Sequence, residues 1–88
     1  MKTSFRESFE KDVRVIHEKN ILARIKTVIE MVEAAPDTRA VAGLKKLKGA
    51  ADYYRIRVGE YRIGIIVGNN EVVFVRVLQR KDIYRYFP

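Results

Sequence analysis

Apolar side chains recur every three or four positions through residues 1–35, the spacing of one face of an amphipathic helix. Two such stripes occur, and the second should end before Pro36, because proline disfavours helical geometry in the residue before it. The first stripe consists of Phe5, Phe9, Val13 and Ile16, and the second of Ile21, Leu22, Ile25, Val28, Ile29 and Val32. The pattern predicts two helices that meet at Lys19-Asn20 in an antiparallel hairpin, with residues 1–5 as a short edge strand.

From residue 52 onward, apolar and polar positions alternate, which is typical of strands with one buried face. The alternation predicts strands over residues 52–58, 61–67 and 71–78. The first two are separated by Gly59-Glu60 and the last two by Gly68-Asn69-Asn70, whose Gly and Asn tolerate the positive φ of hairpin turns. Strands joined by such short turns form an antiparallel meander.

The predicted fold class is therefore α+β: a short N-terminal strand, a two-helix hairpin, a three-stranded antiparallel meander and a short C-terminal helix or tail. Residues 36–51 show a weak pattern and are predicted to be a loop, anchored by Leu44 and Leu47. Residues 80–87 are predicted to pack on the sheet. Eighty-eight residues suit one domain, residues 1–88, with a core of its own.

The net charge of +7 is concentrated in the second half of the chain. Residues 1–35 contain seven Lys or Arg and six Asp or Glu, whereas residues 36–88 contain eleven and five. Such an excess favours a polyanionic partner, because lysine and arginine neutralise phosphates and release counterions. A solubilising surface is the alternative, but the excess is mostly arginine within predicted strands. Nucleic acid is thus the leading candidate partner.

Several kinds of chemistry are excluded or unsupported by the composition. The sequence has no cysteine, so it offers no disulfide, thiol nucleophile or zinc-thiolate site. His17 is the only histidine, which excludes a pair of catalytic histidines, and the sequence has no Gly-rich phosphate loop or metal-binding spacing. We expect no cofactor and no metal. No apolar run approaches the roughly 20 residues needed to span a bilayer, so we expect a soluble cytoplasmic protein with no membrane partner.

Arginines gather on one face of the first predicted hairpin. If Gly59-Glu60 is a two-residue turn, Arg57 lies opposite Arg62, and Arg55 lies opposite Gly64. Like charges in opposed positions are destabilising, which suggests a bound anion that compensates them. Gly64 should leave a gap in which something flat, or a backbone, can approach.

Further basic and aromatic residues are predicted to border this face. In the third strand, Arg76 has the same parity as Phe74 and Leu78, while Arg80 and Tyr84 follow just past its end. The candidate RNA-binding residues are Lys45, Lys46, Lys48, Tyr53 and Arg76. The structural alternative is that the arginines pair with Glu60, Asp52 or Asp82 and the tyrosines fill core edges. Because so few acids lie nearby, we favour a cationic cradle for phosphate with tyrosines that stack on bases, which suits single-stranded RNA.

Three segments resemble the RelE/ParE toxin superfamily, in particular its RelE-type mRNA interferases. They are Lys45-Lys46-Leu47-Lys48-Gly49, the string from Tyr53 to Arg62 that reads YYRIRVGEYR, and Arg80-Lys81-Asp82-Ile83-Tyr84. The predicted order of elements matches the fold of that superfamily over nearly the whole chain. The resemblance implies a metal-independent endoribonuclease that cuts mRNA in the ribosomal A site. It also implies two kinds of partner: the ribosome with its mRNA, and a cognate antitoxin protein.

The resemblance also implies roles for particular residues. Its basic strand residues match Arg55 and Arg57, the arginine after the hairpin matches Arg62, and the C-terminal pair matches Arg80 and Tyr84. The implied reaction is attack of an RNA 2′-hydroxyl on the adjacent phosphate with release of the 5′-oxygen. The arginines would stabilise the charge on the phosphoryl oxygens, with Arg80 near the leaving oxygen.

One departure from the family concerns the general base. Some RelE-type enzymes carry lysines at the two strand positions where this chain has arginines, and arginine, which stays protonated in proteins, is a poor base. The base is then Tyr84, water or the ribosome. Two other functions remain open: a ParE-like inhibitor of DNA gyrase that does no RNA chemistry, and a nucleic-acid-binding module without activity.

Overall fold

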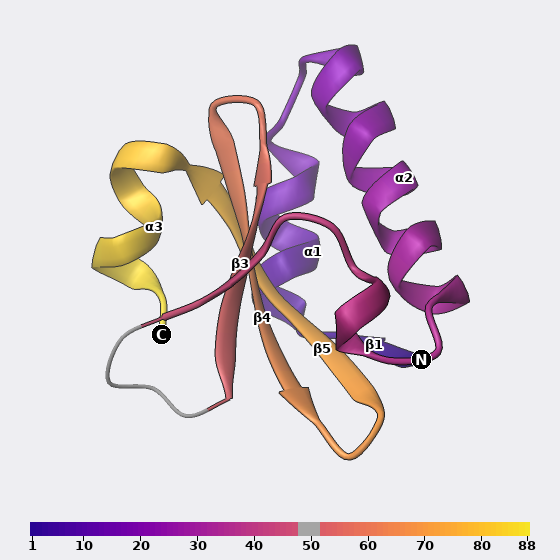
Figure 1. Ribbon diagram of the computed structural model, residues 1–88. Coiled ribbons are helices and arrows are strands. Elements are labelled where there is room, and N and C mark those ends of the chain that lie inside the picture. Colours follow the sequence, from indigo (N-terminus) through magenta and orange to yellow (C-terminus); the bar gives the residue numbers. More distant parts are fainter. Residues whose placement is uncertain (48–51) are drawn as a thin grey trace.

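The computed structural model describes residues 1–47 and 52–88. Along these residues the elements are β1 (Lys2–Phe5), α1 (Glu7–Arg14), α2 (Lys19–Ala34), the 3-10 helix η1 (Thr38–Ala40), β2 (Leu44–Lys46), β3 (Tyr53–Val58), β4 (Tyr61–Gly68), β5 (Glu71–Gln79) and α3 (Arg80–Tyr86). The predicted α+β class is confirmed, with its first strand, two helices, meander and C-terminal helix (Figure 1).

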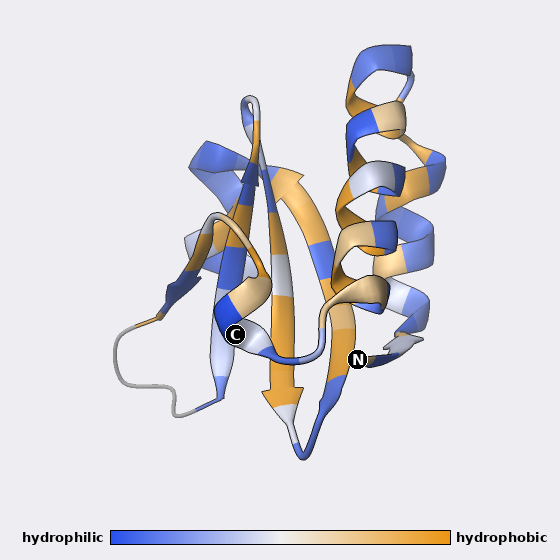
Figure 2. Ribbon diagram, turned by 45° about the vertical axis from the view of Figure 1, so that its right-hand side comes forward, coloured by the Kyte–Doolittle hydropathy of each residue, from blue (hydrophilic) through white to orange (hydrophobic). Residues whose placement is uncertain are grey.

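One sheet forms the middle layer of the molecule. In the described residues it has five strands in the order β1-β5-β4-β3-β2. β3, β4 and β5 form the predicted antiparallel meander, and β1 pairs with β5 in parallel. Helices α1 and α2 lie on one side of the sheet and α3 on the other (Figure 1). The central strands, which are covered on both faces, are correspondingly the most hydrophobic (Figure 2).

Each face of the sheet has its own hydrophobic cluster. The larger one lies under α1 and α2 and includes Ile63 and Phe74, both 0% exposed. The smaller one lies under α3 and contains Leu47, Ile83 and Phe87. Burial of an aliphatic or aromatic side chain of this size contributes roughly 1.5–3 kcal/mol. The smaller cluster therefore holds the short helix α3 in one position on the sheet.

The pairing of β5 with β4 contains a register shift that the alternation of the sequence did not reveal. Gly64 pairs with Arg76 while Ile65 pairs with Phe74, so Val75 is the extra residue of a β-bulge. The bulge places Phe74 in the cluster under α1 and α2, and Leu78 packs against the cluster under α3. The prediction that Phe74, Arg76 and Leu78 share one face is thus wrong.

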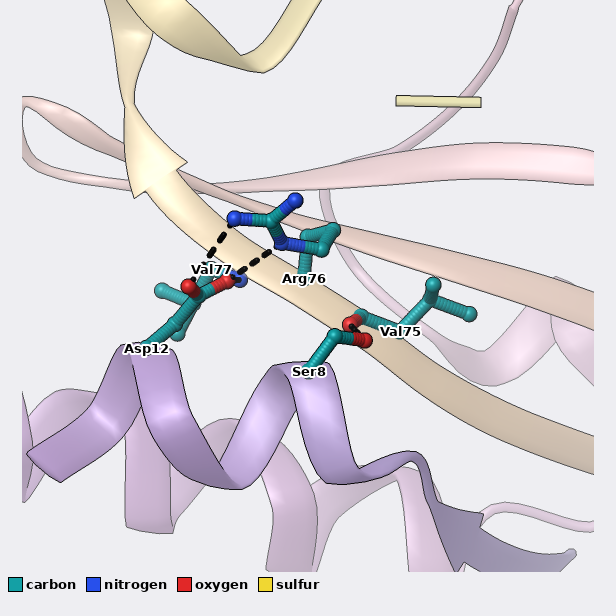
Figure 3. A network of polar contacts seen from close by, with 5 residues as sticks. All are labelled: Ser8, Asp12, Val75, Arg76 and Val77. Carbon is teal, nitrogen blue, oxygen red and sulfur yellow. Dashed lines mark hydrogen bonds and ion pairs between the residues drawn. The ribbon is translucent and has the colours of Figure 1, made fainter. Parts of the chain in front are cut away.

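Beyond the end of β1, side chains of α1 form hydrogen bonds with backbone groups of β5 that have no neighbouring strand in the described part of the chain (Figure 3). The Ser8 hydroxyl donates to the Val75 carbonyl at 2.6 Å, and the Asp12 carboxylate accepts from the Val77 amide at 3.0 Å. The same carboxylate accepts two hydrogen bonds from Arg76, at 2.7 and 3.0 Å. Because unpaired backbone groups at a sheet edge are costly or prone to aggregation, these contacts both cover the edge and attach α1 to it.

Two local predictions need correction. Residues 36–51 were predicted as a loop, but Thr38–Ala40 form a 3-10 turn and Leu44–Lys46 pair with β3 as an edge strand. A three-residue strand is too short for its alternation to be recognised in sequence. Phe5 belongs to β1 instead of α1, and its ring stacks on Phe74 at 5.1 Å between centroids. None of the described helices is both long and apolar enough to cross a membrane.

Candidate functional site

The turn between β3 and β4 sets the register of the candidate site. Val58 pairs with Tyr61, which confirms the two-residue turn at Gly59-Glu60. Gly59 has φ of 57°, a left-handed conformation that glycine adopts without a steric penalty. As predicted, Arg57 lies directly opposite Arg62 in the sheet. Two cations of neighbouring strands are thus held side by side.

Arg62 is a buried cation that hydrogen-bonds to backbone carbonyls. The residue lies in β4 next to the β3–β4 turn and is only 6% exposed. One terminal nitrogen, Nη1, donates to the carbonyls of Gly59 and Tyr61, each at 2.9 Å. Burial lowers the pKa of Arg62, and the nearby charges of other arginines lower it further. Those arginines are Arg55, Arg57 and Arg80.

Helix α3 carries two more predicted residues to the same place. The backbone amide of Arg80, its first residue, donates to the Glu60 carbonyl at 2.7 Å, which ties the start of the helix to the β3–β4 turn. One turn further along, the Tyr84 hydroxyl accepts a hydrogen bond of 3.1 Å from Arg55 Nε. Tyr84 is 58% exposed, so its ring is open to solvent on the other side.

The structure thus brings together all five residues predicted to be catalytic. We call this group the arginine cluster: Arg55, Arg57, Arg62, Arg80 and Tyr84. Its members come from β3, β4 and α3, and they meet because the hairpin sets the register and the turn carbonyl captures the first amide of the helix.

The arginine cluster has no acidic counterpart in the described residues. The structural alternative required ion pairs with Asp52, Glu60 or Asp82, but no carboxylate of residues 1–47 and 52–88 lies within 4.0 Å of a cluster guanidinium nitrogen. The ion pairs of this part of the chain lie elsewhere, for example between Arg39 and Asp37. Buried or crowded cations without a counter-ion bind anions strongly, because the anion relieves their mutual repulsion.

The predicted gap at Gly64 is occupied by the chain itself. A β-carbon at Gly64 would lie 2.6 Å from Cδ2 of Phe87, well inside van der Waals contact. The ring of Phe87 therefore fills the space that we expected to admit a ligand. The sequence reasoning missed Phe87; its signal was an apolar residue four positions after Ile83, the spacing of one helix face.

The residues predicted to bind RNA divide into two groups. Lys45 and Lys46 are exposed on β2, where they line a pocket of about 440 Å³ together with Leu47, Tyr84, Phe87 and Pro88. Lys45 pairs with Arg55, which extends the row of cations across the sheet. These two lysines are thus placed beside the arginine cluster. Lys48 lies outside the described residues.

Tyr53 and Arg76, by contrast, already have structural partners. The Tyr53 ring packs on Phe87, with 5.4 Å between the centroids. Arg76 forms its ion pair with Asp12 and lies 6.0 Å from the centre of the Tyr86 ring. The hydrogen bond to Asp12 raises the pKa of Arg76. These contacts orient both side chains within the fold, and their role in binding RNA stays a prediction.

The arrangement is suited to holding a phosphate and stabilising charge on it. Guanidinium groups from three elements converge, and that of Arg62 is buried away from water. A charged hydrogen bond to an anion is stronger in such a water-poor environment than in solvent. Tyr84 adds a hydroxyl that can donate or accept a proton and an aromatic face. Among the described residues, no group of His, Asp or Glu side chains could hold a metal ion.

Three comparisons identify the relatives of this chain. Residues 4–84 match the model of the family described as the ParE toxin of type II toxin–antitoxin systems. Toxin RelE3 of Methanocaldococcus jannaschii is 45% identical over 89 residues, which cover 100% of both chains.

Among solved structures, the RelB–RelE antitoxin–toxin complex from Methanococcus jannaschii matches with a TM-score of 0.80 and 44% identity, covering 96% of this chain and 98% of the other. The archaeal RelE–RelB complex from Pyrococcus horikoshii has the same fold, with a TM-score of 0.71 at 20% identity over 90% and 93% of the chains. The protein therefore belongs to the RelE/ParE superfamily of toxins from type II toxin–antitoxin systems.

Proposed function

We propose that this protein is the toxin of a toxin–antitoxin pair and acts as a metal-independent endoribonuclease on mRNA in the ribosomal A site. The observation that carries the proposal is the arginine cluster: a buried arginine without an acidic partner in the described residues, bordered by other arginines and an exposed tyrosine. The resemblance to RelE-type mRNA interferases supplies the substrate. We further propose that residues 1–88 form a single toxin domain that works in the cytoplasm and is neutralised by a cognate antitoxin.

The proposed reaction is an in-line displacement at one phosphate. The 2′-oxygen of the RNA forms a bond to phosphorus, the bond from phosphorus to the 5′-oxygen breaks, and a 2′,3′-cyclic phosphate and a 5′-hydroxyl result. The 2′-hydroxyl loses a proton and the leaving 5′-oxygen gains one. Arg55 and Arg62 stabilise the charge on the phosphoryl oxygens, and Arg80 lies near the leaving oxygen. Tyr84, water or the ribosome accepts the 2′ proton, because arginine stays protonated.

The test is a reconstituted translation reaction in which the ends of the mRNA are mapped after the protein is added. The wild type should produce cuts in codons at the A site. Arg62→Ala should lower the rate of cleavage by roughly 10²–10³, the cost of removing one donor that stabilises a developing oxyanion. Arg39→Ala is the matched control, since Arg39 is exposed and pairs with Asp37 outside the arginine cluster.

Two results would overturn this proposal. One is intact message at a concentration of protein that stops translation. The other is an Arg62→Ala variant that keeps the far-ultraviolet circular dichroism of the wild type and also its cleavage rate. RNA binding that weakens steeply with salt but yields no product would instead identify a binding module without activity.

A second candidate function is inhibition of DNA gyrase without RNA cleavage. The match to the ParE family model over residues 4–84 favours it, because that model describes the toxin of parDE. The two candidates share a fold, so only activity separates them. Trapped, cleaved gyrase–DNA complexes in treated cells, together with intact message, would establish the second and eliminate the first.

A further inference from the structure

Phe87 is buried beneath α3 although it lies at the end of a short helix. It is the C-cap residue of α3, it is 2% exposed, and its amide donates to the Ile83 carbonyl at 2.8 Å. Its ring lies against the backbone of β4 at Gly64. A β-carbon there would approach three ring atoms to 2.6, 2.7 and 2.8 Å, so the absence of a side chain at Gly64 makes the contact possible.

The ring is enclosed on its other sides as well. Tyr53 of β3 packs against it at 5.4 Å with the planes tilted by 39°, and Leu47 and Ile83 complete the cluster. The ring of Phe87 thus occupies a site of its own size, lined by the backbone of β4 on one side and by side chains on the others. Gly64 belongs to β4 and Tyr53 to β3, the two strands that also carry three of the cluster arginines: Arg55, Arg57 and Arg62.

Helix α3 is held at both ends, and Tyr84 lies between the two attachments. The Arg80 amide attaches the start of the helix to the Glu60 carbonyl, and Phe87 attaches the end to Gly64. A helix of seven residues is not stable without such tertiary contacts. Tyr84 itself is exposed, and the polar contact of its side chain in the described residues is the hydrogen bond from Arg55. The position of its hydroxyl therefore depends on where the helix is held.

We propose that Phe87 is a positioning residue that sets the distance between the Tyr84 hydroxyl and the guanidinium of Arg55. It does so by filling the notch at Gly64, which fixes the depth and rotation of α3 on the sheet. The effect on catalysis rests on the proposed nuclease function, whereas the effect on the Arg55–Tyr84 contact does not. A displacement of about 1 Å in a reacting group can cost as much as 10²-fold in rate.

The first measurement uses the free protein and no RNA. The Nε–H resonance of Arg55, observed by ¹⁵N nuclear magnetic resonance, reports the hydrogen bond to Tyr84, and Tyr84→Phe identifies its unbonded position. Phe87→Leu should move this resonance toward the Tyr84→Phe position and speed its exchange with water. Phe74→Leu is the matched control: Phe74 is equally buried, but it lies on the opposite face, under α1 and α2. It should leave the resonance unchanged.

The second measurement is cleavage by folded variants. Phe87→Leu should lower kcat roughly tenfold with KM nearly unchanged, within the loss that misplacement of a reacting group can cause. In a Tyr84→Phe background the same substitution should cost less than about twofold, because its effect acts through the hydroxyl. Gly64→Ala should reproduce the loss by pushing on the ring. Adding Phe87→Leu to Gly64→Ala should restore part of the activity, since the smaller side chain makes room for the methyl group.

The outcomes separate this inference from the proposed function. If the wild type cuts no RNA, the nuclease proposal fails, and the Arg55 resonance still decides the role of Phe87. An Arg55 resonance unmoved by Phe87→Leu would overturn the inference, as would equal changes in Phe74→Leu. If Phe87→Leu does not fold, Gly64→Ala provides the same test from the other side of the contact, and a wild-type resonance in that variant refutes the inference.

Discussion

Replacing Arg57 by glutamine should make the protein more stable and less active. Arg57 is exposed and lies directly opposite the buried Arg62, whose pKa is lowered first by burial and then by Arg55 and Arg57 among other arginines. The folded state therefore carries a repulsion that the unfolded chain, with its charges far apart, does not. Glutamine removes the charge and keeps most of the side chain, so little packing is lost.

The expected gain is a fraction of a kcal/mol. Like charges at directly opposed positions of a sheet destabilise it by roughly 0.2–1 kcal/mol. A gain of about 0.5 kcal/mol corresponds to an increase of about 2–4 °C in Tm, because a domain of this size shifts by about 4–8 °C per kcal/mol. Phosphate should achieve the same relief by binding. At ten times its Kd it would stabilise the wild type by about 1.4 kcal/mol, and Arg57→Gln by less.

Thermal unfolding followed by circular dichroism measures the difference. The buffer should have an ionic strength of about 0.01 M and no multivalent anion, because the Debye length is then about 30 Å and the repulsion is fully expressed. Arg14→Gln is the matched control: it removes an exposed arginine in the last turn of α1, where a cation is favourable. It should be neutral or slightly destabilising. If Arg57→Gln is no more stable than Arg14→Gln, or if added salt leaves the difference unchanged, the argument from repulsion is wrong.

Three further predictions concern Asp12, Asp37 and the binding of RNA to the arginine cluster. Asp12→Ala should destabilise the fold by about 2–3 kcal/mol in urea titrations, since it leaves Arg76 and the Val77 amide without their partner; Asp12→Asn, which retains an acceptor, should cost less. The hydrogen bonds from Arg39 lower the pKa of Asp37, so their contribution to stability is fully present above the ordinary carboxyl pKa and is lost as the pH falls through the lowered pKa. The urea midpoints of wild type and Asp37→Asn should therefore converge as the pH falls between these two pKa values. A difference in midpoint that does not change with pH would contradict this role of Asp37. Binding of single-stranded RNA should fall with salt at a slope of about −3 if all four arginines of the cluster contact phosphate; a slope near zero would exclude that mode.

The part of the fold that could be predicted from sequence is the part that local patterns determine. The turn at Gly59-Glu60 and the strict alternation on either side of it predicted that Arg57 pairs with Arg62, and the structure confirms the pairing. The helices followed from the spacing of apolar residues. In these cases each residue's environment depends on neighbours within a few positions, so periodicity alone determines which face it occupies.

What sequence patterns missed depends on contacts between distant residues. The bulge at Val75 is stabilised by Ser8 and Asp12, more than 60 positions away, and nothing in the local sequence marks it. The same applies to Gly64, where we expected an opening for a ligand and the structure has the Phe87 ring. A glycine in a strand indicates that something comes close, but not what it is. Tertiary packing determines which group lies against Gly64. The sequence therefore predicted the close approach, but it did not predict that Phe87 makes it.

The way in which Arg62 is held explains how the cluster can keep its charge available. A carboxylate partner would fix the guanidinium, but a phosphate would then have to displace it and leave a buried acid without a partner, which is costly. Arg62 is fixed instead by the carbonyls of Gly59 and Tyr61, which orient Nη1 without neutralising it. Burial of this cation destabilises the fold, and the hydrophobic cluster on the opposite face of the sheet offsets that loss of free energy. Ile63, the next residue along β4, is fully buried in that cluster. Alternation along β4 thus places Ile63, which stabilises the fold, next to Arg62, whose burial destabilises it, and this is consistent with the proposal that Arg62 binds a phosphate.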